Sequence, residues 1–375
     1  QGVLIEVRRV LVKLHEGSIL SNKGPFFLRQ GPFFPHEGPL KHCNRGLVLI
    51  YIQRQGGITM IHIGIIGLGA IGQRLINQFK QHDGVTITAV CDQMDTLAHE
   101  TADKLGDVKA YTDYKQLLLN EEVDLVYVAV PPKFHHTIVM DAIQAKKHIL
   151  CEKPLANSLE EAKEMADAVK ETGIVHAMNF PLNYGQVATK FAELINENYI
   201  GQLRRLQLSM HFPEWPRAWQ KNDWVAGREQ GGFVLEVGVH FIQQTLKLFG
   251  ELHNIQARLE FPKDPMLCET GIIATAELAD GTPVLIEGIS GQAGIEHIGF
   301  SAYGSEGVLK LENWGELRGG KTGETLESIS VEEVTPSRLI DELVKAVNGG
   351  EAADLYDFEV GYQAQKVLEE LRKEK

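Results

Sequence analysis

The sequence predicts an α/β protein in which a doubly wound parallel sheet is followed by an α+β domain with a large open, mostly antiparallel sheet. Over residues 60–180, short apolar runs alternate with segments of helical spacing, which is the pattern of a parallel sheet covered on both faces. Residues 123–130 are apolar almost throughout, as expected for a central strand of such a sheet. After Gly250, strand-like runs follow one another directly, and Asp280-Gly281 is typical of a hairpin between two of them.

The same alternation places the elements of the parallel half in order. One of its helices is opened by a capping box of Ser158 and Glu161 and is ended by Gly173. The predicted strands are 61–66, 85–92, 108–113, 123–130, 148–153 and 174–180, and the helices between them run through Phe79 and over 96–105, 114–119, 137–147 and 158–170.

The second half begins with a predicted helix over 186–198 and a strand over 202–212. A tryptophan-rich loop then leads to a helix that starts at the two glycines of residues 231 and 232. The strand-like runs after Gly250 predict one sheet of five or more strands, and two helices follow it at the end of the chain. The strand-like runs are 252–261, 271–278, 283–290, 295–304 and 308–314, and the closing helices lie near 337–347 and 354–373.

A glycine pattern marks the first junction between strand and helix. The sequence GLGAIG places Ala70 and Ile71 between the last two of its three glycines. Gly67 permits the tight turn, Gly69 lets the backbone approach a pyrophosphate, and Gly72 lets the helix pack closely on the strand. The N-terminus of that helix offers free N–H groups to phosphate. We therefore expect a dinucleotide-binding Rossmann domain.

Asp92, at the end of the second strand, predicts which dinucleotide is preferred. A carboxylate at this place accepts hydrogen bonds from the adenosine ribose and repels a 2′-phosphate. The residues that follow, QMDTLAHE, contain no Arg or Lys to neutralise such a phosphate, and Asp95 and Glu100 add like charge. We expect NAD to be preferred over NADP.

The composition argues against several other classes of protein. A net charge of −13 over 375 residues disfavours nucleic acid or an anionic membrane surface as a partner. The four cysteines are far apart, which favours buried thiols in a reducing compartment and no metal site. No apolar run reaches the length of a membrane span. We expect a cytoplasmic protein of two or three domains.

Residues 1–59 differ from the rest of the chain. They carry eight Lys/Arg against three Asp/Glu, contain GPFF twice and show no sustained period. One back-translation of Gln55 to Met60 contains a bacterial ribosome-binding sequence shortly before ATG. We therefore predict a non-native or disordered leader ahead of a native start at Met60, with a genuine but poorly ordered arm as the alternative.

Deleting residues 1–59 is expected to leave the Tm and the cofactor affinity nearly unchanged. The physical reason is that this segment has no periodic apolar face with which to dock on the rest of the protein. Thermal unfolding and a cofactor titration of a chain that starts at Met60 test this. A large fall in either quantity would contradict the prediction.

Four local features occur together at matching places in the predicted fold. GLGAIG opens the fold, VPPKFH follows the fourth strand, EKP (Glu152, Lys153, Pro154) ends the fifth, and G-G-x-x-x-E-x-G-x-H lies beyond it. In that spacing the chain resembles the glucose–fructose oxidoreductase/inositol dehydrogenase (Gfo/Idh/MocA) family of nicotinamide-dependent oxidoreductases. The resemblance implies a Rossmann domain over 60–181 and an α+β domain over 182–375. It also implies that the open sheet forms a wall of the substrate pocket and the interface of a homo-oligomer.

The resemblance implies roles for individual residues as well. Lys153 matches the active-site lysine beside the nicotinamide, and His240 matches the catalytic histidine. Glu236 stands where the family usually has aspartate, which leaves open whether it contacts substrate or only orients His240. Asn179 lies near the end of the last parallel strand, where substrate is expected. The residues implied to contact the cofactor are Gly67, Gly69, Ala70, Ile71, Gly72, Asp92, Pro131, His135, Glu152 and Lys153.

Elementary chemistry supports these roles. Oxidation of a secondary alcohol needs a base for the hydroxyl proton, and neutral histidine suits that role near pH 7. A lysine can donate a hydrogen bond to the developing alkoxide, and a carboxylate four residues before His240 can orient the imidazole. Trp219, with Trp215 and Trp224 in the same loop, is either a sugar-stacking wall or interface packing.

The sequence thus predicts an NAD-dependent dehydrogenase that acts on a CH–OH group of a sugar, cyclitol or related polyol. Two other functions stay open. One is a non-catalytic regulator that senses a nucleotide or sugar on the same fold, and the other is a reductase of imines or other unsaturated groups. The presence of Lys153 and His240 argues against the sensor, which needs no proton relay.

Overall fold

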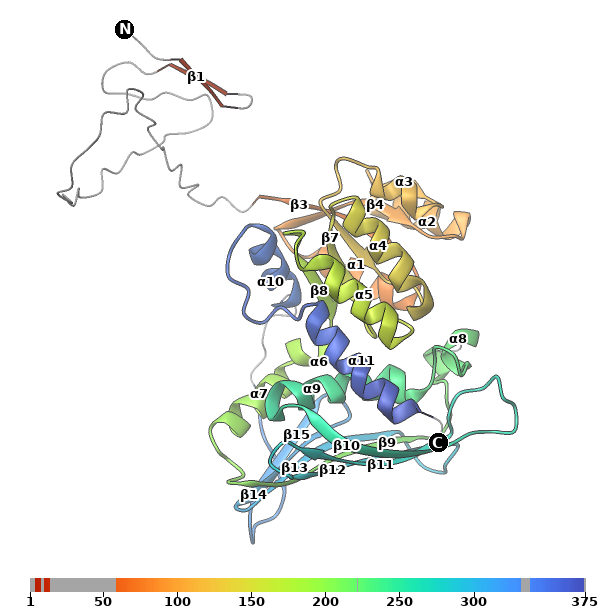
Figure 1. Ribbon diagram of the computed structural model, residues 1–375, viewed down its shortest axis with the longest axis vertical. Helices are drawn as coiled ribbons and strands as arrows, with labels where there is room; N and C mark the ends of the chain where they lie inside the picture. The colour runs from red at the N-terminus through yellow and green to blue at the C-terminus, as the bar shows by residue number, and fades with distance from the viewer. Residues whose placement is uncertain (1–3, 8–9, 14–58, 221, 332–337, 374–375) are drawn as a thin grey trace, which may run out of the picture. The chain divides into compact units, whose positions relative to one another are not determined.

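The computed structural model describes residues 4–7, 10–13, 59–220, 222–331 and 338–373. Within residues 56–375, the first half contains a six-stranded parallel sheet (Figure 1). Its strand order is that of a doubly wound sheet, in which the direction of winding reverses between β3 and β6 and leaves a crevice at their carboxyl ends. The predicted parallel sheet is confirmed. In sheet order its strands are β5 (Lys109–Tyr111), β4 (Val85–Cys91), β3 (Ile61–Ile66), β6 (Leu125–Val128), β7 (His148–Glu152) and β8 (His176–Asn179).

Helices cover both faces of this sheet because its strands are apolar on both sides. One face packs against α1 (Ala70–Phe79), α2 (Asp95–Leu105) and α10 (Arg338–Val347), and the other packs against α3 (Tyr114–Leu118), α4 (His135–Gln144) and α5 (Leu159–Val169).

The helix α10 returns from the end of the chain to the first half. Its apolar residues Leu339, Ile340, Leu343 and Val344 are buried in the same cluster as β3 and α1. The sequence prediction had placed this helix in the second domain, with the boundary at residue 181. By packing, α10 completes the dinucleotide-binding half, because its amphipathic face covers one side of the parallel sheet.

The second half forms an eight-stranded sheet in which β9 and β12 pair in parallel and the other neighbours are antiparallel. Along β11, Ile272 and Ala274 are buried whereas Ile273 and Thr275 are exposed, so one face is covered and the other is open. In sheet order the strands are β10 (Leu252–Glu260), β11 (Gly271–Leu278), β12 (Pro283–Ser290), β9 (Leu203–Phe212), β13 (His297–Gly304), β14 (Gly307–Glu312), β15 (Glu316–Lys321) and β16 (Glu327–Ser328).

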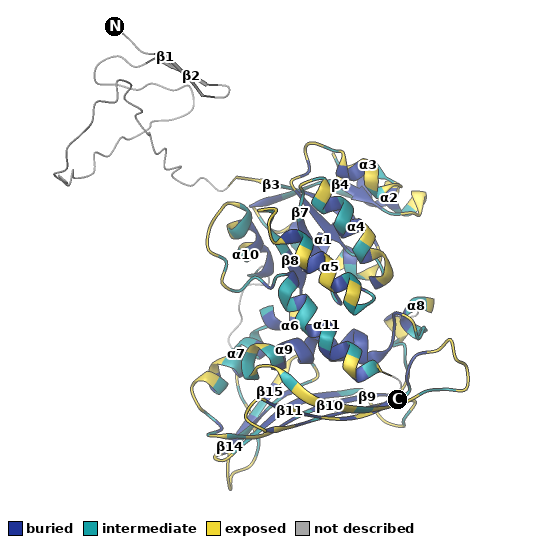
Figure 2. Cartoon of the chain, in the orientation of Figure 1, coloured by how far each residue is buried: buried dark blue, intermediate teal, exposed yellow. Residues whose placement is uncertain are grey.

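Helices lie on the covered face of this sheet, and Figure 1 shows them between the two sheets. They are α6 (Pro181–Tyr184), α7 (Gln186–Asn196), α9 (Val239–Phe249) and α11 (Phe358–Arg372). Residues 239–245 of α9 are all buried, which the dark colouring of this helix shows in Figure 2. This depth of burial places α9 at the junction of the two halves.

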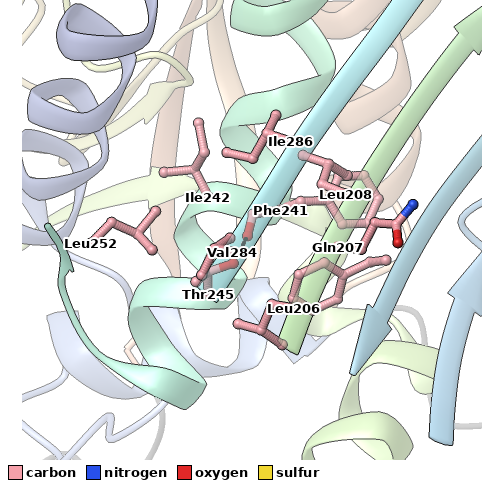
Figure 3. Close-up of a pocket in the computed structure, with 10 residues that line it drawn as sticks. Leu206, Gln207, Leu208, Phe241, Ile242, Thr245, Leu252, Val284 and Ile286 are labelled. Carbon is pink, nitrogen blue, oxygen red and sulfur yellow. Dashed lines mark hydrogen bonds between the residues drawn. The ribbon is translucent and has the colours of Figure 1, made fainter. Parts of the chain in front are cut away.

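The helix α9 packs closely against the sheet. Phe241, Ile242 and Thr245 face Leu206 of β9 and Val284 of β12 (Figure 3). The space enclosed among these side chains is about 10 Å³, which accommodates no more than one water molecule. It shares no lining residue with the larger cavity described below, and we interpret it as a gap in the packed core.

In residues 1–55, β1 (Leu4–Val7) and β2 (Val10–Lys13) pair antiparallel. The sequence predicted no element there. The rest of the predicted leader up to residue 58 lies outside the described residues, so the leader stays a prediction. Among the helices that the structure describes, none is both long and apolar enough to cross a membrane.

Candidate active site

The site begins at the glycine turn after β3. Gly67 has a φ of +97°, and a Cβ there would lie 2.5 Å from the carbonyl oxygen of Ala129. A Cβ at Gly72 would lie 2.2 Å from the Gly67 carbonyl oxygen, whereas a Cβ at Gly69 would meet nothing within 4 Å. The first and third glycines are therefore required by the turn and by helix packing. Gly69 borders open space, where the sequence pattern places a pyrophosphate.

The N-terminus of α1 is available to an anion. Its N-cap is Gly69, which makes no side-chain capping hydrogen bond, and no acidic side chain occupies the first turn. Asp92 is held beside the turn, because its two carboxylate oxygens accept hydrogen bonds from the N–H groups of Leu68 and Met94, both at 2.9 Å. These residues fit the dinucleotide expected from the sequence.

A cavity of about 730 Å³ runs from this turn to the second half of the chain. Its size is that of an ordinary small-molecule or cofactor pocket. Of the predicted site residues, those in its lining are Gly67, Gly69, Ala70, Ile71, Asp92, Pro131, Glu152, Lys153, Trp219 and Glu236, whereas Gly72, His135, Asn179 and His240 lie outside the lining.

Lys153 and Glu236 meet across this cavity. The Lys153 Nζ donates to the main-chain oxygen and to Oε2 of Glu236, both at 3.3 Å. The side chains are only 12% and 6% exposed, so the ion pair is screened little by water and salt. The other carboxylate oxygen, Oε1, is buried and has no hydrogen-bond partner among the described residues. A buried acceptor of this kind is unfavourable unless a donor reaches it, and a ligand hydroxyl can supply that donor.

Glu236, the acidic partner of Lys153, lies in a stretch of irregular helix. Residues Val234–Gly238 (η3) form a turn of π-helix ahead of α9, a feature that often occurs at functional sites. The sequence left open whether Glu236 contacts substrate or only orients His240. The carboxylate makes its ion pair with Lys153, and the His240 Nδ1 is buried without a partner among the described residues. The glutamate side chain reaches the ammonium because opposite charges attract strongly away from water. The orienting contact with His240 is thus absent among the described residues, and the contact of Glu236 with substrate stays a prediction.

His240 lies in an aromatic environment. Its ring packs against Phe180 and Trp314, with ring centroids 6.5 and 5.3 Å away, and the residue is 5% exposed. Burial, together with the positive charges of Lys153 and Arg217, lowers the pKa of His240 well below its usual value. The imidazole is therefore neutral at pH 7, and the same surroundings make it a weaker base than a free imidazole.

Glu152 is held by two buried donors. Its Oε1 accepts hydrogen bonds from the hydroxyl of Tyr127 and, at 2.6 Å, from Nδ2 of Asn179. Burial raises the pKa of Glu152, although these hydrogen bonds and the charge of Lys153 act in the opposite direction. Asn179 was predicted near the substrate, but it lies outside the cavity lining and orients the residue before Lys153. Tyr127 was not singled out from the sequence, because its hydroxyl was the only sign of function within an apolar strand.

His135 connects two loops beneath the cavity. Its Nδ1 lies 2.9 Å from the carbonyl oxygen of Pro154, and its Nε2 lies 2.8 Å from that of Val130. Burial lowers the pKa of His135. The ring of His135 thus links the loop after β6 to the loop after β7, and its contact with the cofactor stays a prediction. Pro131, next to this link, does line the cavity.

The loop after β9 closes the cavity on the side of the second half. Trp219 in η2 (Ala218–Gln220) and Trp224 in α8 (Asp223–Ala226) both belong to the lining. Polar Gln220 and Asn222 lie between them and also line it, and their only sequence signal was this position between two tryptophans.

Trp215 has a different place from the other two tryptophans. Its ring packs on Phe212 and Phe233, with centroids 4.9 and 5.9 Å away, and its indole N–H donates to the Val225 carbonyl oxygen. Of the two interpretations of this loop, packing fits Trp215, whereas Trp219 and Trp224 border the cavity.

Two buried histidines and two half-buried ones predict a loss of stability in mild acid. Burial lowers the pKa of His135, His148, His176 and His240 from 6.5. Below that pH the unfolded chain binds more protons than the folded one, so the free energy of unfolding falls. Burial raises the pKa of two acids, Glu152 and Glu269, above 4.5. These two groups increase the free energy of unfolding as the pH falls towards 4.5, so they partly offset the histidines. We expect the urea midpoint to fall between about pH 7.5 and about pH 5.5; an unchanged or higher midpoint would contradict this.

The described residues contain no group of three or more His, Cys, Asp or Glu side chains that could hold a metal ion. Three cysteines of this part of the chain, Cys91, Cys151 and Cys268, are buried free thiols.

Two protein-family models match the chain. The model described as "Oxidoreductase family, NAD-binding Rossmann fold" matches residues 61–180, and the model described as "GFO/IDH/MocA C-terminal domain" matches residues 189–310. Their boundary coincides with the change from the parallel to the antiparallel sheet.

Individual proteins of known sequence are also similar to this chain. The chain is 29% identical over 191 residues to the myo-inositol 2-dehydrogenase of Thermotoga maritima (51% of this chain, 55% of the relative). It is 33% identical over 199 residues to the 2,7-anhydro-N-acetylneuraminate hydratase of Escherichia coli (52% and 50%). The chain spans about half the length of the curated relatives it matches.

Among solved structures, a levoglucosan dehydrogenase in complex with NADH superposes with a TM-score of 0.72. The match covers 84% of this chain and 96% of the other at 21% identity, and it shows a common fold. One assignment thus explains the two family matches, the glycine turn and the cavity that joins this turn to Lys153. The chain belongs to the Gfo/Idh/MocA family of NAD-binding oxidoreductases.

Proposed function

We propose that the protein is an NAD-dependent dehydrogenase that transfers hydride between the nicotinamide and a CH–OH group of a sugar, cyclitol or related polyol. The observation that carries the proposal is the cavity that joins the dinucleotide turn to the Lys153–Glu236 pair. Relatives named as an inositol dehydrogenase and a levoglucosan dehydrogenase support this substrate class. Trp219 and Trp224 support it too, because the C–H face of a sugar ring can lie on an aromatic ring.

The bound nicotinamide supplies the acceptor for hydride. As the hydride leaves carbon, the hydroxyl loses its proton, and the products are a carbonyl compound, reduced cofactor and one proton. Lys153, whose side chain is only 12% exposed, donates a hydrogen bond to the oxygen on which negative charge develops. Glu236 holds the ammonium and offers Oε1 as an acceptor for a substrate hydroxyl. The role of His240 as the proton acceptor stays the prediction made from the sequence, and the lowered pKa of its buried imidazole opposes that role.

The test is incubation of the purified protein and NAD with myo-inositol, levoglucosan and methyl glucosides. Growth of the absorbance of reduced nicotinamide with one of them supports the proposal. Binding of NADH and polyol without any turnover would favour a sensor instead. Since one relative is named a hydratase, products are also followed by NMR. Net addition of water without accumulation of NADH would replace the dehydrogenase with that chemistry.

The preference for NAD over NADP is proposed from the surroundings of Asp92. Of the cavity residues next to it, Gln93, Thr112 and Asp113 carry no positive charge. Replacing Asp92 with alanine should therefore narrow the affinity ratio of NAD to NADP by about tenfold, as expected for removal of one close charge repulsion. Asp103→Ala, which removes an exposed carboxylate of α2 outside the lining, is the matched control. Tighter binding of NADP to the unmodified protein would refute this.

We also propose a cytoplasmic homo-oligomer that forms through the open face of the antiparallel sheet. Ile273 and Ile289 lie on that face and are 67% and 44% exposed, and a second copy would cover them. Light scattering of the eluted protein tests the oligomer. The buried free thiols suit a reducing compartment.

A further inference from the structure

A buried carboxylate lies against the start of the helix that carries Glu236. Glu269 precedes β11, is 3% exposed, and its Oε1 accepts a hydrogen bond from the N–H of Val234 at 2.8 Å. A Cβ on Gly232 would lie 2.2 Å from one of its carboxylate oxygens and 2.5 Å from the other. The carboxylate thus occupies the space that a side chain at residue 232 would need. This contact, with the φ of +100° at Gly232, accounts for the second glycine of the G-G-x-x-x-E motif.

The start of the helix provides the surroundings that this carboxylate needs. Burial raises the pKa of Glu269, while the N–H groups of Val234 and Phe233 and the positive charge of Arg372 act in the opposite direction. A carboxylate away from water is unfavourable unless donors replace its hydration, and the N-terminal end of a helix supplies both donors and a favourable dipole. Glu269 does not line the cavity, so it cannot touch the ligand itself.

Glu269 is itself firmly attached to the cavity wall. The N–H of Cys268 donates to the Ala226 carbonyl oxygen, and the N–H of Arg228 donates to the Met266 carbonyl oxygen, both at 2.9 Å. These bonds join the segment before β11 to the loop that follows α8. The carboxylate therefore connects the segment before β11, which is hydrogen-bonded to this loop, to the π-helical turn.

Only Leu235 separates Val234 from Glu236, whose main-chain and side-chain oxygens both accept from Lys153. A shift of this turn would move both acceptors together. We propose that Glu269 is a positioning residue that holds the first turn of this helix so that Glu236 reaches Lys153. The inference rests on the proposed function only in taking the Lys153–Glu236 pair as the reacting groups.

The test measures Lys153 directly and needs no substrate. The rate at which formaldehyde and a borane reductant methylate Lys153 is followed by mass spectrometry in the full chain. Loss of the anchor should free the ammonium from Glu236, so Glu269→Ala should raise this rate at least about fivefold. Glu277→Ala, an exposed carboxylate at the other end of β11, is the matched control and should leave the rate unchanged.

A double-mutant cycle separates positioning from general destabilisation. In the Glu236→Ala background the Lys153 contact is already lost, so Glu269→Ala should add little. Equal acceleration in both backgrounds, or a rate equal to the Glu277→Ala control, would overturn the proposal. If Glu269→Ala does not fold, Glu269→Gln carries the same cycle with an expected rise of about twofold, because its amide oxygen still accepts from Val234.

Activity gives an independent readout. If the polyol assay detects turnover, Glu269→Ala should lower kcat while the Kd for NADH stays unchanged, because the glycine turn is untouched. If the unmodified protein turns over no polyol, the proposed function fails, and the methylation rates still decide whether Glu269 positions the pair.

Discussion

Replacing Lys153 with alanine should lower kcat by about two to four orders of magnitude while the Kd for NADH changes little. This is the range expected when a group that stabilises charge or transfers a proton in the transition state is removed. Binding should survive because we expect the turn from Gly67 to Gly72 and the N-terminus of α1 to hold the phosphates. Steady-state kinetics and a fluorescence titration of NADH measure the two quantities.

The controls for this experiment address charge and stability. Removal of Lys153 leaves the Glu236 carboxylate buried without its cation, which by itself destabilises a protein. Lys153→Met retains the apolar stem, and the Tm of both variants shows how much folded protein remains. Lys170→Ala removes a lysine whose ion pairs lie on the surface of α5 and should leave kcat unchanged. A Lys153→Ala enzyme that is folded and turns over at the unmodified rate would exclude Lys153 from the reaction.

Alanine at Gly72 and alanine at Gly69 should produce opposite defects. The methyl group at residue 72 would lie 2.2 Å from the Gly67 carbonyl oxygen, and relieving this clash requires α1 to move away from β3. The free energy of unfolding should fall by about 3 kcal/mol or more. At residue 69 the methyl group meets no protein atom within 4 Å, so stability should change by less than about 0.5 kcal/mol. It would instead fill the space proposed for the pyrophosphate and weaken NADH binding at least about tenfold.

Each of these variants serves as the control for the other. Thermal unfolding without cofactor measures stability, and titration of the folded protein measures affinity. Equal losses of Tm in the two variants would show that the turn is not packed as described. Unchanged NADH affinity in Gly69→Ala would place the pyrophosphate elsewhere.

The local patterns of the sequence were sufficient for most of the first half. The six parallel strands and the helices between them follow from runs that are each read over a few residues. The glycine turn and Asp92 are also local, because the conformation of a tight turn depends mainly on the residues within it. The helix α10 could not be placed in this way. Its amphipathic pattern shows that it covers something, but not which of two sheets lies under it.

Within the site, residues whose role depends on a distant partner were predicted least well. Glu236 and His240 are close in sequence, which suggested a contact, yet the partner of Glu236 is Lys153, 83 residues earlier. Asn179 donates a hydrogen bond to Glu152, and the ring of His135 contacts main-chain carbonyl oxygens. Glu269 gave no signal at all, because a lone glutamate before a strand is ordinarily exposed.

The sequence by itself determined the class of fold, the dinucleotide turn and the lysine at the end of β7, since backbone conformation and strand burial depend on near neighbours. Only the tertiary structure decided which charged group Lys153 meets, which tryptophans reach the cavity and which carboxylate lies against the start of the helix that carries Glu236. Those contacts join segments far apart in the chain, and the free energy of a buried charge depends on the atoms around it in space, whatever their separation in sequence.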